Sequence, residues 1–424
     1  MSKIEDIQHG DHVKVVKDGE EFFGVLMPNA TTDVVIKLKS GYNVGFAPEG
    51  LHVTLVKKRG PVTAVRPSRS IRPELPRLSI ISTGGTIASK IDYRTGAVTS
   101  QFDAEDIIDA IPSLAEIANI EGVMLYNILS ENMQPKLWSE LALCVYNQVR
   151  AGAYGVLVTH GTDTLGYSAA ALSFMLQVPV PVMLVGSQRS ADRPSSDNVV
   201  NATCAAVAAT SDLAGVFTVM HEGASDDTCV VHLGTRTKKL HTSRRDAFRS
   251  VNADPVARVK FQERSLQFLS DQIGRGGCEL SVHPKIEPKC ALIKFFPGAN
   301  PDIMNFYLTQ GYKGLVIEGT GLGHVMSEWV PHVKEITEVI PVVMTSQCVY
   351  GAVCDRVYDT GRDLLKAGII EGGDMLSETA LVKLMWVLGQ TSDREEIRKL
   401  MRTNIAGEIT VDESRTWETF EELP

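Results

Sequence analysis

The sequence predicts an α/β protein in which a two-domain body with parallel β-sheets follows a small N-terminal β-barrel. Short alternating strands with Asp-Gly and Ser-Gly turns occupy residues 11–56, a pattern typical of a small barrel or sandwich. From residue 78, apolar runs alternate with helical stretches, which indicates βαβ units. An irregular, glycine-containing stretch at residues 262–288 then precedes a second, shorter set of strands and helices.

The composition is that of an ordinary globular protein. The 424 residues are 44% hydrophobic and 22% charged, and the formal net charge of −9 argues against a general nucleic-acid coating protein. The amino terminus lacks a signal-peptide pattern, and apolar runs such as residues 178–185 are far shorter than the roughly 20 residues of a membrane helix. Seven cysteines without Cys-x-x-Cys spacing suit reduced thiols. We therefore expect a cytoplasmic protein of two or three domains.

The small β-barrel domain is predicted over residues 1–58, with strands at residues 12–16, 34–38 and 51–56. An attachment module is the simpler interpretation of this domain, and an RNA-binding barrel is the alternative. Residues 59–76 contain four prolines and several basic side chains, which predicts an extended linker. Its basic side chains would either contact RNA phosphates or remain solvated, and composition alone does not decide between these.

The rest of the chain is predicted to form two α/β domains and a tail. The larger domain is expected over residues 77–265, a connection over 266–288, the smaller domain over 289–400 and an acidic tail over 401–424. Strands and helices are expected in the following segments of the two domains: 78–81, 137–149, 155–158, 166–176, 180–185, 290–293, 314–317, 341–344 and 377–388.

Two threonine-containing segments follow predicted strands of the larger domain. Residues 82–89 read Ser-Thr-Gly-Gly-Thr-Ile-Ala-Ser, and residues 159–165 read Thr-His-Gly-Thr-Asp-Thr-Leu. Each places a threonine near glycine at a strand end, where α/β sheets form ligand crevices. Taken alone, each segment is equally compatible with a strand-to-helix turn that has a capping hydroxyl.

Thr86 and Thr162 are candidate groups for attack on a carboxamide. A threonine hydroxyl is a poor nucleophile until a neighbouring base removes its proton. Asp163 is suited to hold a lysine whose amine accepts that proton. The residues from Gly161 onward open a predicted helix, and the amide groups at its start would bind a carboxylate or an oxyanion. Together these features predict an amide-hydrolysing site.

Motifs for metals and nucleotides are missing from the sequence. There is no His-Glu-x-x-His pattern and no Gly-x-x-x-x-Gly-Lys-Ser/Thr phosphate loop. Residues 319–324, Gly-Thr-Gly-Leu-Gly-His, have the wrong glycine spacing for a dinucleotide fingerprint. We predict no metal and no cofactor in this chain.

Residues 83–88 and 160–164, in this order and spacing, resemble the two signatures of the asparaginase/glutaminase family. The resemblance covers most of the two predicted α/β domains and implies an asparaginase-like fold. It also implies a third element, a lysine upstream of residues 248–250. Counting back from that segment favours Lys239 over Lys238 as the matching residue.

By this resemblance, Thr86 is the nucleophile that forms an acyl-enzyme ester. Thr162, Asp163 and Lys239 form a second triad, which relays protons and activates water. The sequence leaves open which threonine attacks first.

The same resemblance assigns substrate-binding residues. Tyr93 matches a mobile-loop tyrosine beside the nucleophile, although an exposed loop tyrosine is the alternative. Ser130 and Glu131 match the segment that holds the charged groups of the substrate, with Gly161 beside them. Secreted family members often have glutamine where Glu131 stands, so glutamine or asparagine preference stays open.

The N-terminal barrel and the linker are not parts of a free asparaginase. With residues 344–348 and 372–380, the whole arrangement resembles the glutaminase components of the archaeal glutamyl-tRNA(Gln) amidotransferases. The resemblance implies a homodimer within a heterotetramer, in which this chain releases ammonia from glutamine. The E-type partner of these amidotransferases would use ATP and Mg to convert Glu-tRNA(Gln) to Gln-tRNA(Gln). The alternatives are a stand-alone cytosolic L-asparaginase with an accessory N-terminal domain and an RNA-binding scaffold that retains an amidase fold.

Overall fold

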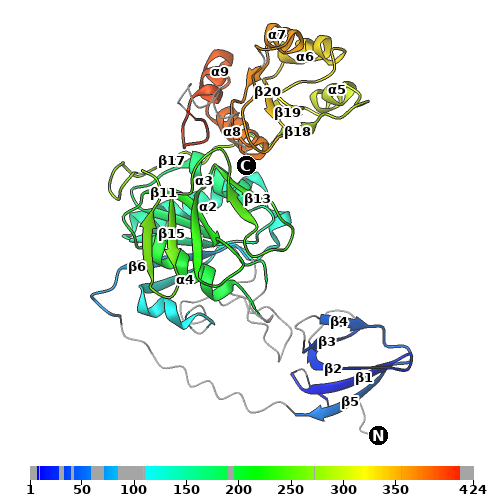
Figure 1. The fold of residues 1–424 in the computed structure, drawn as a ribbon, viewed down its shortest axis with the longest axis vertical. Helices are drawn as coiled ribbons and strands as arrows, with labels where there is room; N and C mark the ends of the chain where they lie inside the picture. The colour runs from blue at the N-terminus through cyan, green and yellow to red at the C-terminus, as the bar shows by residue number, and fades with distance from the viewer. Residues whose placement is uncertain are drawn as a thin grey trace.

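The computed structural model describes three bodies along the chain (Figure 1). In Figure 1 the N-terminal sheet lies apart from two α/β domains, which follow each other along the long axis. The described residues are 7–8, 10–27, 33–39, 43–58, 71–84, 108, 110–189, 195–271, 273–354 and 356–410.

The N-terminal body is a five-stranded antiparallel sheet with the order β4-β3-β2-β1-β5. Asp18 and Gly19 both have positive φ angles, of 51° and 84°, which is the geometry of a tight two-residue hairpin turn between β1 and β2. The small β-rich domain is confirmed, but β4 and β5 remain unpaired edges among the described strands, which therefore form an open sheet and not a closed barrel. The strands are β1 (His12–Lys17), β2 (Glu20–Met27), β3 (Val34–Leu38), β4 (Asn43–Phe46) and β5 (His52–Lys57).

The larger domain is built on an eight-stranded sheet with the order β16-β15-β12-β11-β10-β8-β6-β7. The five neighbouring strands β7, β6, β8, β10 and β11 run parallel, as predicted. The pairs β11–β12, β12–β15 and β15–β16 are antiparallel. Residues 222–227 connect β11 to β12, which is too short for the crossover that a parallel pair needs. The predicted parallel pairing thus holds for the central strands, and the antiparallel strands at one edge make the sheet mixed. The strands are β6 (Arg77–Ser82), β7 (Asn119–Met124), β8 (Gly155–Thr159), β10 (Pro181–Val185), β11 (Gly215–His221), β12 (Thr228–Leu233), β15 (Ala257–Lys260) and β16 (Ser265–Phe268).

Helices cover both faces of the central strands. Along β8, Val156 and Val158 pack with α2 (Pro135–Arg150) and α3 (Leu165–Met175), whereas Leu157 packs with α4 (Asn198–Ala209) on the other face. This division follows from the period-two alternation of side chains along a strand. Because both faces are buried, the strands read as continuous apolar runs, and the loops at their carboxyl ends remain free for chemistry.

Several short elements complete the larger domain. Two pairs form small antiparallel sheets, β13 with β14 and β9 with β17. Their bounds, with those of two 3₁₀ turns, are β9 (Leu176–Gln177), β13 (Thr237–Lys239), β14 (Phe248–Ser250), β17 (Ser281–Val282), η2 (Pro112–Glu116) and η3 (Ser130–Asn132).

The smaller domain has a four-stranded parallel sheet with the order β18-β19-β20-β21. Its helix α8 shares a hydrophobic core with α3 of the larger domain, and Phe174 stacks on Trp386 with ring centroids 6.0 Å apart. The two domains are therefore joined by packing as well as by the chain. The elements are β18 (Cys290–Lys294), α5 (Asp302–Thr309), β19 (Gly314–Gly319), α6 (Trp329–Thr337), β20 (Val342–Ser346), α7 (Asp359–Lys366), β21 (Ile370–Glu371), α8 (Ser377–Gln390) and α9 (Arg394–Arg402).

Within the described parts of the chain, no helix has the length and apolarity required to cross a membrane.

Candidate active site

The two threonine segments meet at the carboxyl ends of neighbouring parallel strands. β6 and β8 pair in register, with Ser82 opposite Thr159. Just beyond this point, the Thr83 amide donates to the Thr159 carbonyl over 3.1 Å, and the Thr83 hydroxyl donates to the same oxygen over 3.0 Å. The segments that the sequence places far apart thus begin at one edge of the sheet, where open α/β sheets bind ligands.

A lysine amine bridges the two side chains that the second segment supplies. Lys239 Nζ donates to Thr162 Oγ1 over 2.9 Å and to Asp163 Oδ1 over 2.8 Å. The Lys239 side chain is 15% exposed and that of Asp163 is 68% exposed. The ion pair therefore lies at the rim of the site, with the carboxylate on the solvent side and the lysine largely covered. This arrangement brings together three of the predicted site residues and can move protons to or from the Thr162 hydroxyl.

The hairpin that carries Lys239 explains why its neighbour lies elsewhere. In the β13–β14 ladder, Lys239 pairs with Phe248, and successive side chains of β13 point to opposite sides. Lys238 accordingly forms an ion pair with Glu378 of the smaller domain. The two lysines of this strand thus face different partners, Lys239 facing Thr162 and Asp163, and Lys238 facing the smaller domain.

The loop after β10 supplies a contact that sequence reasoning missed. Thr162 Oγ1 donates to Gln188 Oε1 over 3.4 Å. Gly186 backs the same side chain, because a Cβ there would lie 2.8 Å from Thr162 Cγ2. No motif marks Gln188, and the only available signal was its place just after β10, which pairs with β8.

A buried carboxylate holds that loop in place. Asp197 is fully buried and accepts hydrogen bonds from the Ser187 hydroxyl at 2.8 Å, the Gln188 amide at 3.0 Å and the Arg189 amide at 2.9 Å. A carboxylate that accepts this many donors fixes the backbone on which Gln188 sits. Asp197 was also missed, because a lone acidic residue before a helix reads as an ordinary cap.

Ser130 and Gly161 lie against each other beside the triad. A Cβ on residue 161 would lie 2.8 Å from Ser130 Oγ, so the close approach requires glycine. Thr164 Oγ1 donates to the Ser130 carbonyl over 2.7 Å, which ties this segment to the start of α3. Ser130 is buried, whereas Glu131 is exposed to solvent.

His160 forms a buried support beneath the loop. The Gly161 carbonyl can only accept, so His160 Nδ1 carries the ring proton and donates to it over 2.7 Å. In the neutral ring His160 Nε2 then accepts from the Ser168 hydroxyl over 2.8 Å, and Ser168 Oγ accepts from Trp138 Nε1 over 2.9 Å. Burial lowers the pKa of His160, against the opposing effect of that carbonyl, and the neutral ring fixes the Gly161 peptide.

The remaining two predicted residues, Thr86 and Tyr93, lie outside the described residues. The chain leaves β6 toward them through Gly84, which has a φ of +110°. A Cβ at Gly84 would lie 2.3 Å from the Ile128 carbonyl oxygen, so both the backbone angle and the space require glycine. This accounts for the first glycine of the Thr-Gly-Gly-Thr segment.

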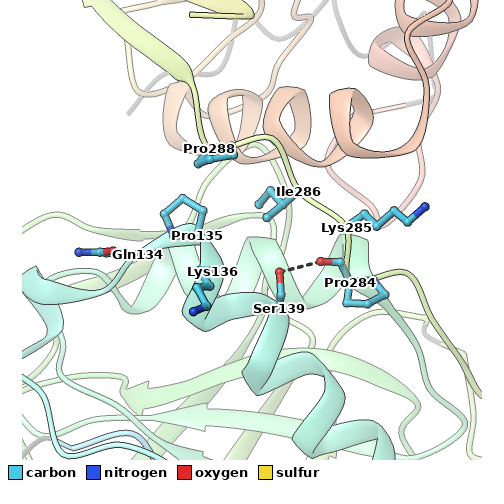
Figure 2. A pocket seen from close by; sticks show the side chains of 8 residues that line it. All are labelled: Gln134, Pro135, Lys136, Ser139, Pro284, Lys285, Ile286 and Pro288. Atoms are coloured by element: carbon cyan, nitrogen blue, oxygen red, sulfur yellow. Dashed lines mark hydrogen bonds between the residues drawn. The ribbon is translucent and has the colours of Figure 1, made fainter.

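A recess of about 370 Å³ lies elsewhere, at the connection between the two domains (Figure 2). In Figure 2 it opens between the start of α2 and the chain that leads to the smaller domain, and Ser139 Oγ donates to the Pro284 carbonyl over 2.6 Å. Of the predicted site residues that the structure describes, none lines it; the lining residues are Gln134, Pro135, Lys136, Ser139, Pro284, Lys285, Ile286 and Pro288. The recess belongs to the domain connection, and it is distinct from the threonine site.

The described residues contain no group of three or more His, Cys, Asp or Glu side chains placed to hold a metal ion.

The fold and the threonine–aspartate–lysine arrangement define the body of the chain as an asparaginase-type amidohydrolase. Family models match it as "Asparaginase, N-terminal" over residues 77–273 and as "Glutaminase/Asparaginase C-terminal domain" over residues 289–401. Residues 7–56 match the "GatD N-terminal domain". The thermostable L-asparaginase from Thermococcus kodakarensis superposes with a TM-score of 0.71 and 36% identity, covering 79% of this chain and 100% of that chain.

Relatives of nearly full length specify the family further. The GatD protein of Methanosarcina barkeri, named as a component of glutamyl-tRNA(Gln) amidotransferase, is 52% identical over 418 residues, which is 96% of this chain and 99% of the relative. The GatD protein of Archaeoglobus fulgidus, which has the same name, is 53% identical over 401 residues, covering 94% of this chain and 95% of the relative. The chain belongs to the GatD family of glutamyl-tRNA(Gln) amidotransferase components, and the resemblance seen in its motifs is confirmed.

Proposed function

We propose that this chain hydrolyses glutamine and supplies the ammonia to a partner that amidates Glu-tRNA(Gln). The observation that carries the proposal is the Lys239 amine bridging Thr162 and Asp163. The nearly full-length match to GatD proteins, together with the match of residues 7–56 to the GatD N-terminal domain, supports ammonia transfer to tRNA over a stand-alone L-asparaginase.

In the proposed reaction, the Thr86 hydroxyl attacks the side-chain carbonyl carbon of glutamine. The C–N bond then breaks, the nitrogen leaves as ammonia after gaining a proton, and Thr86 is left as a glutamyl ester. Water adds to the ester, and glutamate departs as Thr86 regains its proton. The sum is glutamine plus water giving glutamate plus ammonia.

Thr162, Asp163 and Lys239 are assigned to the proton transfers of these two steps. The carboxylate of Asp163 holds the amine of Lys239, which meets the hydroxyl oxygen of Thr162. That hydroxyl is placed to pass a proton toward the departing nitrogen and to orient the incoming water. Ser130, Gly161, Glu131 and Tyr93 are assigned to substrate binding.

Membership of the GatD family implies that the chain works in a complex. We assign GatE, the E-type component of these amidotransferases, as the partner, with ATP and Mg used there and no cofactor in this chain. We also assign a homodimer of this chain within a heterotetramer. We place the complex in the cytoplasm, which suits the seven cysteines, all of them free thiols.

The test is glutamine-dependent amidation of Glu-tRNA(Gln) by the chain copurified with GatE. We expect Gln-tRNA(Gln) to form, and glutaminase turnover to rise when Glu-tRNA(Gln) is added. Fast hydrolysis of asparagine by the isolated chain, unaffected by partner or tRNA, would contradict the proposal and favour the stand-alone asparaginase. Unchanged ammonia release in Thr162→Ala would remove this residue from the assigned machinery.

A further inference from the structure

The hairpin that carries Lys239 belongs to the larger domain, but the smaller domain forms hydrogen bonds to both of its sides. Thr379 Oγ1, in the first turn of α8, donates to the Thr235 carbonyl over 2.8 Å. Just beyond the other strand of the hairpin, β14, Asn252 Nδ2 donates to the Asp374 carbonyl over 2.9 Å, and Asn252 Oδ1 accepts from the Gly351 amide over 3.0 Å. Both sides of the hairpin are therefore tied across the domain boundary.

Arg236 makes the most extensive of these contacts. Its guanidinium donates to Asp374 Oδ2 over 2.8 Å, to the Gly407 carbonyl over 2.8 Å and to Thr410 Oγ1 over 3.2 Å. The side chains of Arg236 and Asp374 are 3% and 7% exposed. A buried charge pair with its remaining donors satisfied fixes geometry strongly, because a small shift would leave charged groups unpaired.

The segment that receives Arg236 is itself rigidly held inside the smaller domain. Residues 403–410 follow α9 and are closed by the Lys383–Glu408 ion pair, whose two side chains are fully buried. Lys383 Nζ also donates to the Thr403 carbonyl over 2.6 Å, and the Glu408 carboxylate accepts from the Ala406 amide over 2.6 Å. The segment therefore presents its carbonyl groups to the hairpin from a fixed position.

The contact nearest to the site is the ion pair between Lys238 and Glu378. Lys238 precedes Lys239 directly, and its side chain points to the opposite side of β13, toward the start of α8. Two consecutive lysines on one short strand thus have different partners: Lys238 contacts the smaller domain, and Lys239 contacts the Thr162 hydroxyl. A displacement of the first lysine carries the second one with it.

We propose that the smaller domain positions the proton-relaying Lys239, through Arg236–Asp374 and Lys238–Glu378, so that ammonia release depends on how the two domains are seated. The inference rests on the proposed function and adds a means of control to it. Arg236, Lys238, Asp374 and Glu378 are positioning residues, since none of them touches Thr162. A partner that shifts the smaller domain changes the Lys239–Thr162 distance and with it the rate of ammonia release.

The test compares Lys238→Met with Glu378→Gln in the full chain, with and without its amidotransferase partner. Both variants break the same contact, but they change the local charge in opposite directions: the first removes a cation near Lys239 and the second removes an anion. If the contact positions Lys239, both variants displace its amine from Thr162 and lower kcat for glutamine hydrolysis by roughly tenfold, with little change in KM. The double variant is expected to be no slower than either single variant, because one contact is lost in all three.

A purely electrostatic effect on Lys239 predicts something different. The pH–rate profiles of the two single variants would then move in opposite directions, and the shifts would cancel in the double variant. That result, or wild-type kcat in both variants, would overturn the proposal. Hydrogen exchange at residues 236–240 is expected to become faster in both variants, whereas a role in folding alone would lower the melting temperature and leave kcat per folded molecule unchanged.

Lys366→Met is the matched control, because it removes an exposed lysine paired with Asp363 on α7 of the same domain, away from the hairpin. It is expected to leave kcat unchanged. Arg236→Lys serves as a milder variant of the buried pair and is expected to lower kcat as well. A wild-type chain that releases no ammonia from glutamine would contradict the proposed function, whereas an active wild type with fully active variants would contradict the positioning role alone.

Discussion

Two lysine–carboxylate pairs in this chain share a geometry and differ in surroundings. Lys239 Nζ lies 2.8 Å from Asp163 Oδ1, and Lys383 Nζ lies 2.5 Å from Glu408 Oε1. The second pair is fully buried between α8 and the segment after α9, whereas Asp163 is largely exposed. The same kind of ion pair therefore occurs both at the exposed edge of the candidate site and inside a hydrophobic core.

The other partners of each ammonium explain the difference in role. Lys383 donates to the backbone carbonyls of Met401 and Thr403, which hold it without offering any chemistry. Lys239 donates to the Thr162 hydroxyl, which can exchange a proton. Burial lowers the pKa of Lys383, with Glu408 opposing that effect. A lysine ion pair is thus structural or reactive according to its third partner and its access to water.

The largest expected effect comes from removing the reactive amine. Lys239→Met is expected to lower kcat for glutamine hydrolysis by about 1,000-fold, because the Thr162 hydroxyl loses its proton partner. The melting temperature should change little, since the Lys239–Asp163 pair lies at the rim of the site. Single-turnover ammonia release and thermal unfolding of the same preparation measure the two effects. Normal turnover in this variant would show that the pair is structural and would remove the contrast with Lys383.

The second prediction concerns the buried pair. Lys383→Met is expected to lower the free energy of unfolding by about 3–5 kcal/mol, because Glu408 is left as a buried charge without its cation. Adding Glu408→Gln is expected to recover part of the loss. Denaturant unfolding of the wild type, the single and the double variants measures this. The exposed pair variant Lys366→Met is the control and should lie within about 0.5 kcal/mol of the wild type. A loss of that small size in Lys383→Met would contradict a structural role for this pair.

The contrast between the pairs also marks what could be predicted from the sequence. Thr162 and Asp163 were found because they sit in one continuous segment after a strand. Lys239 needed the family resemblance, since its approach to Thr162 depends on the register of a hairpin far along the chain. Lys383 could not be identified, because a lysine within a helix reads as solvent-exposed until a partner from another segment covers it.

The same reasoning applies to the fold. The βαβ alternation predicted the central parallel strands, since each strand carries an apolar run long enough to be buried on both faces. The antiparallel part of the sheet was missed, although the short link at residues 222–227 was the physical signal for it. Gln188 and Asp197 gain their places only from the pairing of β10 with β8, which local sequence does not encode.

The third prediction uses a buried group that stays neutral, in contrast to both charged pairs. Burial, with Arg249 adding to the effect, lowers the pKa of His232 from its ordinary 6.5 to about 3. As the pH falls below 6.5, the unfolded chain binds a proton at this ring and the folded chain does not, so the unfolding free energy falls with falling pH. Between pH 6.5 and 5 the loss is about 2 kcal/mol.

Unfolding by denaturant at pH 7, 6 and 5 measures this loss. His232→Gln should flatten the pH dependence by about that amount. An equally steep dependence in His232→Gln would assign the effect to other groups, such as His160, whose pKa burial also lowers.

The smallest effect is expected at Gln188, whose neutral amide oxygen accepts a hydrogen bond from the Thr162 hydroxyl. This prediction tests whether Gln188, in addition to Lys239, orients that hydroxyl. Gln188→Met keeps the length of the side chain and removes the acceptor of the 3.4 Å hydrogen bond from Thr162 Oγ1. A net hydrogen bond of about 1 kcal/mol corresponds to a decrease in kcat of roughly fivefold, with KM nearly unchanged. Gln188→Glu places a carboxylate at the same distance, where it competes with Asp163 for the Lys239 amine and should slow turnover further than Gln188→Met does. If both variants turn over glutamine at the wild-type rate, the orientation of the hydroxyl comes from Lys239 alone, and the loop after β10 contributes nothing to the difference between the reactive pair and the buried one.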